Sequence, residues 1–175
     1  MLVTEAGGLP PGRALDVGCG EGADALWLAR RGWHVTAVDI SPTALRRAAA
    51  EATEVTGSVE WVRADLTTTP PPGGAFDLVS VHYFPLARQP GDAAPRQLLD
   101  AVAPGGTLLF VSHHPAGHST REGFDPSDYY QPGDIAGLLD RDWTVVVDET
   151  RPRTASAPAG THHTHDTVLR AQRPW

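Results

Sequence analysis

The sequence contains one cysteine, Cys19, and no lysine among its 175 residues. A single cysteine excludes an internal disulfide, so the fold must be held together by its core. All 14 basic residues are arginines, and 21 acidic residues outnumber them, which gives a formal net charge of -7. A broad basic face for non-specific nucleic-acid binding is therefore not expected.

Long apolar runs are missing as well. No stretch approaches the roughly 20 residues that a membrane-spanning helix needs, and no signal peptide precedes Leu15. We therefore expect a soluble, cytoplasmic protein that makes no use of a membrane. The length of the chain predicts one domain with a single core over residues 1–175.

Short β-rich runs alternate with helical segments along the chain. We expect strands over residues 13–18, 34–40, 59–65, 76–84, 107–113, 143–150 and 165–173, and helices over residues 23–32, 41–52, 94–102 and 134–142. Ser41 before Pro42 is typical of a helix start, and Gly32 is well placed to end a helix. The alternation predicts an α/β fold with a mainly parallel sheet. Only a loop separates the last two strands, which predicts an antiparallel hairpin.

The stretch LDVGCGEGAD, residues 15–24, follows the pattern of a ligand-binding turn. Gly18, Gly20 and Gly22 come directly after the first strand, and a turn without β-carbons lets a ligand approach the main chain. The third glycine comes one residue earlier than in the dinucleotide fingerprint G-x-G-x-x-G. Asp16 precedes the turn, and an acid there suits a ligand with a positive group better than a pyrophosphate. Together with the terminal hairpin, this argues against an NAD-dependent oxidoreductase.

Two further acids end neighbouring strands. Asp39 ends the second strand, where a carboxylate can accept hydrogen bonds from both hydroxyls of a ribose. Asp65 ends the third strand and is placed to reach an adenine amino group. Ligands of open α/β sheets bind beyond the carboxyl ends of the strands, so a nucleoside site is expected at this edge.

Six stretches carry a family resemblance: LDVGCGEG (15–22), VTAVDIS (35–41), RADL (63–66), FDLVSVH (76–82), APGGTLLFV (103–111) and the terminal hairpin. With these six stretches in this order, the sequence resembles the class I S-adenosylmethionine-dependent methyltransferases, and among them small bacterial enzymes of the tellurite-resistance and thiopurine-methyltransferase type. The resemblance implies a Rossmann-like, doubly wound sheet of seven strands that is mainly parallel with an antiparallel C-terminal strand. It also implies S-adenosyl-L-methionine as cofactor and S-adenosyl-L-homocysteine as product.

The resemblance assigns the cofactor-binding residues as well. The glycine turn would hold the methionine part, Asp39 the ribose, and the residues after the second and third strands the adenine. The end of the fourth strand would face the sulfonium and the substrate entrance. The set implied is Asp16, Gly18, Cys19, Gly20, Gly22, Asp39, Ile40, Ala64, Asp65, Leu66, Ser80 and Val81.

Methyl transfer from a sulfonium is an in-line displacement, so the protein must align the reactants and exclude water, while a general base is optional. The expected acceptor is a small molecule. Thiol, metalloid, amine, hydroxyl and carbon acceptors all stay open. Nucleic-acid methylation is disfavoured by the acidic balance and by HYFP at the end of the fourth strand, where an Asn/Asp-Pro-Pro-Tyr type motif would be expected.

Seven of the eight histidines are expected near the carboxyl edge: His82, His113, His114, His118, His162, His163 and His165. One interpretation is a catalytic base or proton shuttle, with His82 and His113 as the candidates. A second is a metal site formed by HHxxxH and HHTH, and a third is solvated loop histidines. No metal is assigned. Aromatic residues that we expect near an acceptor pocket are Tyr83, Phe84, Phe124, Tyr129 and Tyr130, and Arg151 and Arg153 are candidates for attracting an anionic acceptor.

Residues 1–12 resemble the remnant of an N-terminal helix that caps the cofactor in relatives. A reduced cap predicts that another subunit, in a homodimer, or the loop over residues 113–131 covers the cofactor. The alternative to an enzyme is a non-catalytic S-adenosylmethionine-binding or His-rich metal-binding module of the same fold.

Overall fold

The computed structural model describes residues 1–53, 55–114, 125–153 and 164–175. Helices and strands alternate over most of the chain, as the sequence predicts. The helices are α1 (Leu2–Ala6), α2 (Ala23–Arg30), α3 (Pro42–Ala50), α4 (Ala93–Ala101) and α5 (Pro132–Ala136), with short 3-10 turns η1 (Pro90–Asp92) and η3 (Pro126–Asp128). The strands are β1 (Arg13–Val17), β2 (His34–Asp39), β3 (Ser58–Arg63), β4 (Phe76–His82), β5 (Val102–His113), β6 (Thr144–Pro152) and β7 (His165–Gln172).

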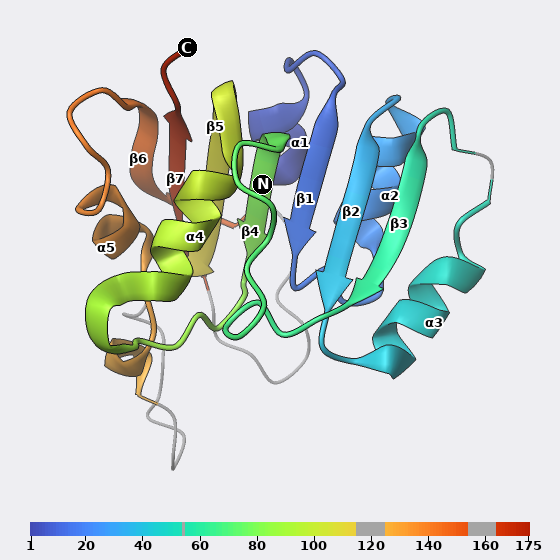
Figure 1. Ribbon diagram of the computed structural model, residues 1–175, viewed down its shortest axis with the longest axis horizontal. Coiled ribbons are helices and arrows are strands. Elements are labelled where there is room, and N and C mark those ends of the chain that lie inside the picture. Colours follow the sequence, from blue (N-terminus) through green and yellow to red (C-terminus); the bar gives the residue numbers. More distant parts are fainter. Residues whose placement is uncertain (54, 115–124, 154–163) are drawn as a thin grey trace.

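The strands form one seven-stranded sheet in the order β3-β2-β1-β4-β5-β7-β6 (Figure 1). The first five strands pair in parallel, while β7 pairs antiparallel with both β5 and β6. The first three strands are added towards one edge of the sheet and the next two towards the other, so β1 and β4 meet at the switch point of the sheet. The predicted doubly wound fold with a terminal antiparallel hairpin is confirmed.

Two apolar clusters hold the sheet, one on each face. The first contains Leu15, Val17, Val79 and Val81 with residues of α4 and α5. The second contains Ala14, Leu78, Leu109 and Val111 with residues of α1 and α2. Successive side chains of a strand point to opposite faces, which explains this division.

The same alternation gathers polar residues at the carboxyl edge. Asp16 lies two residues after Ala14, and Ser80 and His82 continue the series that Leu78 begins, so all three share the face covered by α1 and α2. His113 of β5 and Asp166 of β7 lie on this face too, directly opposite each other in the sheet register. On this face, the apolar residues at the strand centres are thus packed in the core, and the polar residues lie side by side at the carboxyl ends of the strands.

Most local signals act as expected. The Ser41 hydroxyl accepts the Ala44 N–H at 3.2 Å, with Pro42 at the first position of α3. Gly32 has φ +90° after α2, and its N–H donates to the Ala29 carbonyl, while Trp33 N–H donates to the Leu28 carbonyl. This pair of bonds is a Schellman ending that a glycine permits.

Two elements differ from the prediction by more than two residues at one end. The helix expected over residues 134–142 ends at Ala136, where Gly137 caps it, because glycine is costly inside a helix. The APGG stretch after α4 is not a loop between elements. It lies within β5, which pairs first at Val102 with Phe76 and then shifts register, and Gly105 takes φ +74° at this irregularity.

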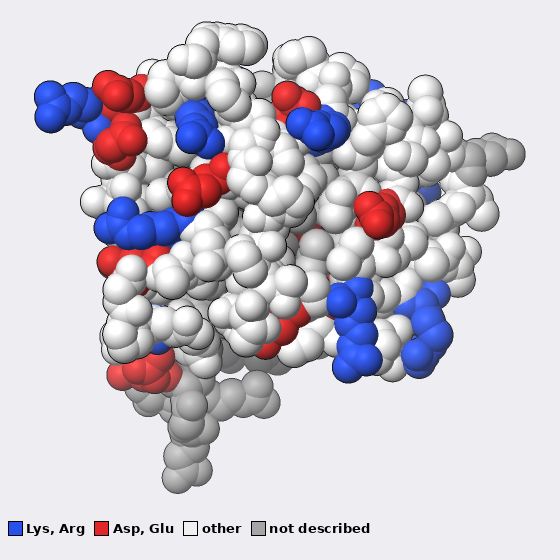
Figure 2. Space-filling model, in the orientation of Figure 1, with Lys and Arg blue, Asp and Glu red and all other residues white. Residues whose placement is uncertain are grey.

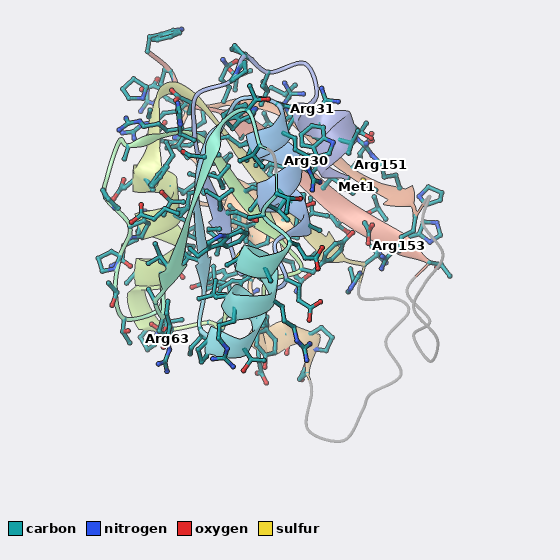
Figure 3. All side chains as sticks on the ribbon, turned by 90° about the vertical axis from the view of Figure 1, so that its right-hand side faces the viewer. Met1, Arg30, Arg31, Arg63, Arg151 and Arg153 are labelled. Carbon is teal, nitrogen blue, oxygen red and sulfur yellow. The ribbon has the colours of Figure 1, made fainter. Side chains whose placement is uncertain are left out.

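α1 is fastened to the hairpin by a buried acid. Glu5 is 5% exposed, and its carboxylate accepts a hydrogen bond from Arg151 of β6 at 2.7 Å, with Arg170 of β7 at 3.8 Å. Figure 3 shows Arg151 close to Met1, at the start of α1. Arg151, predicted as a candidate for attracting an acceptor, therefore contacts α1.

Charges of both signs are interspersed on the face drawn in Figure 2, without one continuous basic area. In the part of the chain that the structure describes, no helix is long and apolar enough to span a bilayer.

Candidate active site

The glycine turn after β1 has three left-handed glycines with different surroundings. Gly18 and Gly22 have φ of +68° and +81°, and a β-carbon would lie 2.6 Å from the Phe84 ring at the first and 2.5 Å from Trp61 at the second. Gly20 has φ +54°, but a β-carbon there would meet no atom of the described residues within 4 Å. Packing thus accounts for the first and third glycine, and the open space over Gly20 is where a ligand can touch the main chain.

Asp39 connects this turn to the end of β2. Its two carboxylate oxygens accept the N–H of Gly20 at 2.9 Å and of Ser41 at 2.8 Å. Each oxygen keeps capacity for a further hydrogen bond. The next residue, Ile40, is 63% exposed, a large apolar side chain left uncovered beside this carboxylate. The pair suits the polar sugar and apolar base of a nucleoside.

Asp16 is the most unusual acid of the site. It is 2% exposed, and within the described part of the chain its Oδ2 atom has no hydrogen-bond partner. Burial, with the nearby Asp24 and Asp39 carboxylates, raises the pKa of Asp16 to about 8, against a lowering effect of the Ala25 amide. A buried, unsatisfied carboxyl next to other acids is costly, and a cation would satisfy it.

A cavity of about 210 Å³ opens over this carboxyl, lined by Asp16, Gly18, Cys19, Glu21, Ala23, Asp24, His82 and Tyr83. His82 Nδ1 lies 2.6 Å from Oδ2 of Asp24, while its buried Nε2 has no partner among the residues that the structure describes. The Ser80 hydroxyl, neighbour of Asp16 in the sheet register, is equally unpartnered. Three buried polar atoms at this edge, Oδ2 of Asp16, Oγ of Ser80 and Nε2 of His82, could therefore form hydrogen bonds with a ligand.

Four other residues of the predicted cofactor set do not line the cavity, namely Ala64, Asp65, Leu66 and Val81. Asp65 accepts the N–H and hydroxyl of Thr67, which lowers the pKa of its carboxyl, and the Ala64 N–H donates to the Asp39 carbonyl. Leu66 and Val81 are buried in the apolar cluster under α4. Cys19 lines the cavity, and burial together with Asp16 raises the pKa of its thiol to about 12, which makes it unreactive.

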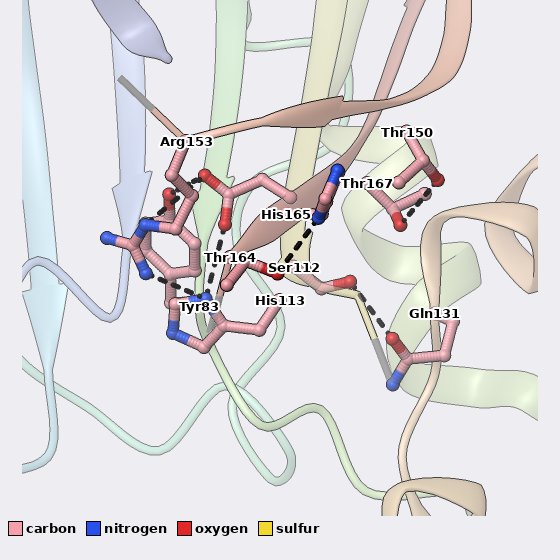
Figure 4. A network of polar contacts seen from close by, with 10 residues as sticks. Tyr83, Ser112, His113, Gln131, Thr150, Arg153, Thr164, His165 and Thr167 are labelled. Atoms are coloured by element: carbon pink, nitrogen blue, oxygen red, sulfur yellow. Dashed lines mark hydrogen bonds and ion pairs between the residues drawn. The ribbon is translucent and has the colours of Figure 1, made fainter. Parts of the chain in front are cut away.

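A second polar network lies beyond Tyr83, at the ends of β4, β5 and β7 (Figure 4). The Tyr83 hydroxyl donates to Oδ2 of Asp166 at 2.8 Å, and Nδ1 of His113 lies 3.2 Å from Oδ1. The Tyr83 ring stacks on His113 with 4.3 Å between centroids. Burial, with the hydrogen bond to Asp166, raises the pKa of Tyr83, so its phenol stays protonated at neutral pH.

Each predicted histidine thus has an acidic partner that the sequence analysis missed, Asp24 for His82 and Asp166 for His113. Asp166 follows His165 at the start of the last predicted strand. Asp166 lies opposite His113 because β7 pairs antiparallel with β5 in one particular register. That register cannot be predicted from the residues of either strand alone.

His114 and His165 also reach this edge, where the His114 N–H donates to the His165 carbonyl. Among the described residues, no group of three or more His, Cys, Asp or Glu side chains could hold a metal ion. His118, His162, His163 and Phe124, which the sequence analysis named, lie outside the described residues.

A family model described as a methyltransferase domain matches residues 14–106, from β1 through the glycine turn to β5. The chain belongs to the methyltransferase domain family. The sequence resemblance is thereby confirmed, and S-adenosylmethionine is the cofactor of this family.

Among its relatives is an uncharacterized methyltransferase of Mycobacterium tuberculosis, 40% identical over 102 residues, which are 56% of this chain and 49% of the relative. A probable thiol methyltransferase 2 of Arabidopsis thaliana is 32% identical over 111 residues, 61% of this chain and 49% of that protein. The chain spans about half the length of these relatives.

Solved structures share the fold. The N-methyltransferase NodS from Bradyrhizobium japonicum, in complex with S-adenosyl-L-homocysteine, superposes with a TM-score of 0.72 at 20% identity over 99% of this chain and 84% of NodS. TehB from Haemophilus influenzae gives a TM-score of 0.75 at 15% identity, over 98% of this chain and 61% of TehB.

The residues of this chain fit the family's cofactor. The open space over Gly20 admits a backbone contact, and the unpartnered Oδ2 of Asp16 matches an ammonium group. Asp39 and Ile40 match a ribose and a base. The cofactor's sulfonium and amino group carry positive charge, which suits a cavity lined by Asp16, Glu21 and Asp24.

Proposed function

We propose that this protein transfers the methyl group of S-adenosylmethionine to a small-molecule acceptor by in-line displacement. The observation that carries the proposal is the buried Asp16 carboxyl, which lines a cavity between the glycine turn and His82 and whose Oδ2 has no partner in residues 1–53, 55–114, 125–153 and 164–175. Such a carboxyl destabilises the fold unless it binds something positive.

In this proposal, Asp16 binds the amino group of the cofactor, Asp39 accepts from the ribose hydroxyls, and Ile40 packs against the adenine. The bound cofactor supplies an activated methyl group on a good leaving group. The protein aligns the acceptor with that methyl and excludes water, through Phe84 and Tyr83 at the entrance. His82, held by Asp24 at 2.6 Å, is a candidate to accept a proton at Nε2.

Two observations support a small acceptor. The space beside the cofactor cavity is a half-open pocket of about 90 Å³ that includes Tyr83, Phe84 and His113, which is small compared with a protein or nucleic-acid groove. The net charge of -7 opposes binding to a polyanion. We propose further that the protein acts in the cytoplasm, as its single cysteine permits.

Calorimetry with S-adenosylhomocysteine tests cofactor binding. Asp16→Asn and Asp39→Ala are expected to weaken binding by at least about tenfold, because each removes a charge-assisted hydrogen bond. Asp77→Ala is the matched control: Asp77 accepts the Arg13 N–H at 2.7 Å at the opposite edge of β1. It is expected to bind as the parent protein does.

Two outcomes would contradict this proposal. One is undiminished binding by Asp39→Ala. The other is tight cofactor binding without release of S-adenosylhomocysteine from any class of acceptor, which would favour the non-catalytic binding module.

A further inference from the structure

His82 and Asp24 form a pair that connects α2 to the end of β4. Nδ1 of His82 lies 2.6 Å from Oδ2 of Asp24, across 58 positions of sequence. Asp24 belongs to the first turn of α2, where the positive end of the helix dipole favours a negative charge. Both side chains line the cavity of about 210 Å³ together with Asp16 and Tyr83. The pair is therefore part of the site of the proposed reaction.

The two members of the pair differ in exposure. The His82 side chain is 9% exposed and its Nε2 atom is buried, whereas the Asp24 side chain is 38% exposed. The member that a small molecule in the cavity can touch is therefore Asp24. A histidine that donates its Nδ1–H to a carboxylate holds that carboxylate in a fixed position. The geometry thus gives His82 the supporting place and leaves Asp24 open to a ligand.

Asp24 keeps both negative charge and hydrogen-bonding capacity for a ligand. Within the described ranges of the chain, His82 is the one side chain that bonds to its carboxylate, through Oδ2, so Oδ1 can accept a further hydrogen bond. Glu21, another acid of the cavity, is instead paired with Arg47 at 2.7 Å. In the proposed function, Asp16 binds the amino group of the cofactor. Asp24 is thus the acid of the cavity that remains for the acceptor.

The charge of Asp24 determines which acceptor suits the site. When a neutral amine attacks the methyl group, its nitrogen becomes positive, whereas a thiolate loses its negative charge in the same step. A carboxylate beside the reacting atom stabilises the first change and repels the thiolate. An alcohol must lose a proton to a base, and the candidate atom for this, Nε2 of His82, is buried. The site therefore favours an amine, which needs no base.

We propose that the acceptor is a small primary or secondary amine that reacts as its free base, that Asp24 accepts a hydrogen bond from the amine N–H, and that His82 is the positioning residue for Asp24. This inference rests on the proposed function. The lone pair of the nitrogen forms the new N–C bond, and the electron pair of the breaking C–S bond stays on sulfur. The positive charge moves from sulfur to nitrogen, and no proton is transferred in this step. The product leaves as an ammonium ion.

Amines and thiols with the same carbon skeleton test the role of Asp24. At alkaline pH, the parent protein is expected to methylate ethylamine and benzylamine with a higher kcat/KM than ethanethiol and benzyl mercaptan. Asp24→Asn keeps the shape of the side chain and removes its charge. It is expected to lower kcat/KM for the amines by about tenfold or more, and to leave that for the thiols unchanged or higher. Asp148→Asn, which changes an exposed acid of the edge strand β6, is the matched control and should alter neither.

Two substitutions of His82 separate positioning from proton transfer. The amide nitrogen of asparagine is as many bonds from the main chain as Nδ1, so His82→Asn can still donate to Asp24, whereas the amide nitrogen of glutamine corresponds to Nε2. His82→Gln is expected to lower kcat/KM for the amines by about tenfold, and His82→Asn to keep at least about a third of the parent value. The reverse order would make Nε2 a general base and overturn the positioning role, and so would equal losses.

Three further results would contradict the inference. A similar loss with amines and thiols in Asp24→Asn would reduce Asp24 to a structural role. If Asp24→Asn weakened the binding of S-adenosylhomocysteine by more than about tenfold in calorimetry, Asp24 would belong to the cofactor site instead. Methylation of thiols or alcohols, with no amine methylated, would overturn the acceptor class while the proposed function stands. Failure of the parent protein to bind S-adenosylhomocysteine at all would instead refute the proposed function itself.

Discussion

Asp16 is a buried acid, and its protonation state controls what the site can bind. Its pKa is raised to about 8, so at pH 6 most molecules carry the neutral acid. An ammonium group requires the carboxylate. The affinity for S-adenosylhomocysteine is therefore expected to rise with pH between about 6 and about 8, by up to about tenfold per pH unit, and then to level off. Calorimetry at several pH values measures this, and Asp16→Asn should show a flat profile.

The same residue links pH to stability. The pKa of Asp16 is 3.8 when unperturbed and about 8 in the fold, so between these values the folded state holds its proton more tightly than the unfolded state does. The contribution of Asp16 to the free energy of unfolding is thus present at acid pH and is lost as the pH rises toward about 8. Relative to the parent, Asp16→Asn should gain in Tm as the pH increases from about 5 to about 8. A difference in Tm that stays constant would show that Asp16 is not the cause.

The glycine turn allows a matched pair of substitutions at the scale of one element. Gly20→Ala adds a methyl group to open space at φ +54°, so it should cost only about 1–2 kcal/mol of stability while weakening S-adenosylhomocysteine binding at least tenfold. Gly22→Ala would push against Trp61 and Ala48 and should destabilise the fold more. Denaturant unfolding and calorimetry on both variants separate the effects. Unchanged binding by Gly20→Ala would show that no ligand lies over the turn.

Sequence patterns predicted the elements far better than the contacts between them. The glycine turn, the Ser41 cap and the three acids at strand ends are local signals, because each depends on neighbours within a few residues. The partners of the histidines are not local: Asp24 and His82 are 58 positions apart, and His113 and Asp166 are 53 apart. Pairing at such separations depends on strand order and register, which one sequence does not state. For the same reason the sequence alone makes Arg151 a candidate for attracting an anionic acceptor, whereas in the fold it binds Glu5.

At the scale of the whole molecule, the buried Glu5 connects both ends of the chain. Glu5→Ala removes the acid that faces Arg170 and one of the two acids that Arg151 contacts, the other being Glu149, and should lower the free energy of unfolding by about 2 kcal/mol, because the hydrogen bond of a buried charged group is lost. Arg47→Ala, which removes the exposed Arg47–Glu21 pair at 2.7 Å, should cost less than about 1 kcal/mol. Urea unfolding compares the two. Similar costs for both variants would mean that α1 does not depend on its bond to β6.

Because β7 lies between β5 and β6 in the sheet, the strands cannot all pair in the order in which they are synthesised. β6 emerges from the ribosome first but has no neighbour in the sheet until residues 165–172 follow it. The strands around the glycine turn can pair long before that point, so a nascent chain can form the edge that carries Asp16, Gly20 and Asp39 early. Asp166 belongs to β7. Its contacts with Tyr83 and His113 can therefore form only when this last strand pairs between β5 and β6.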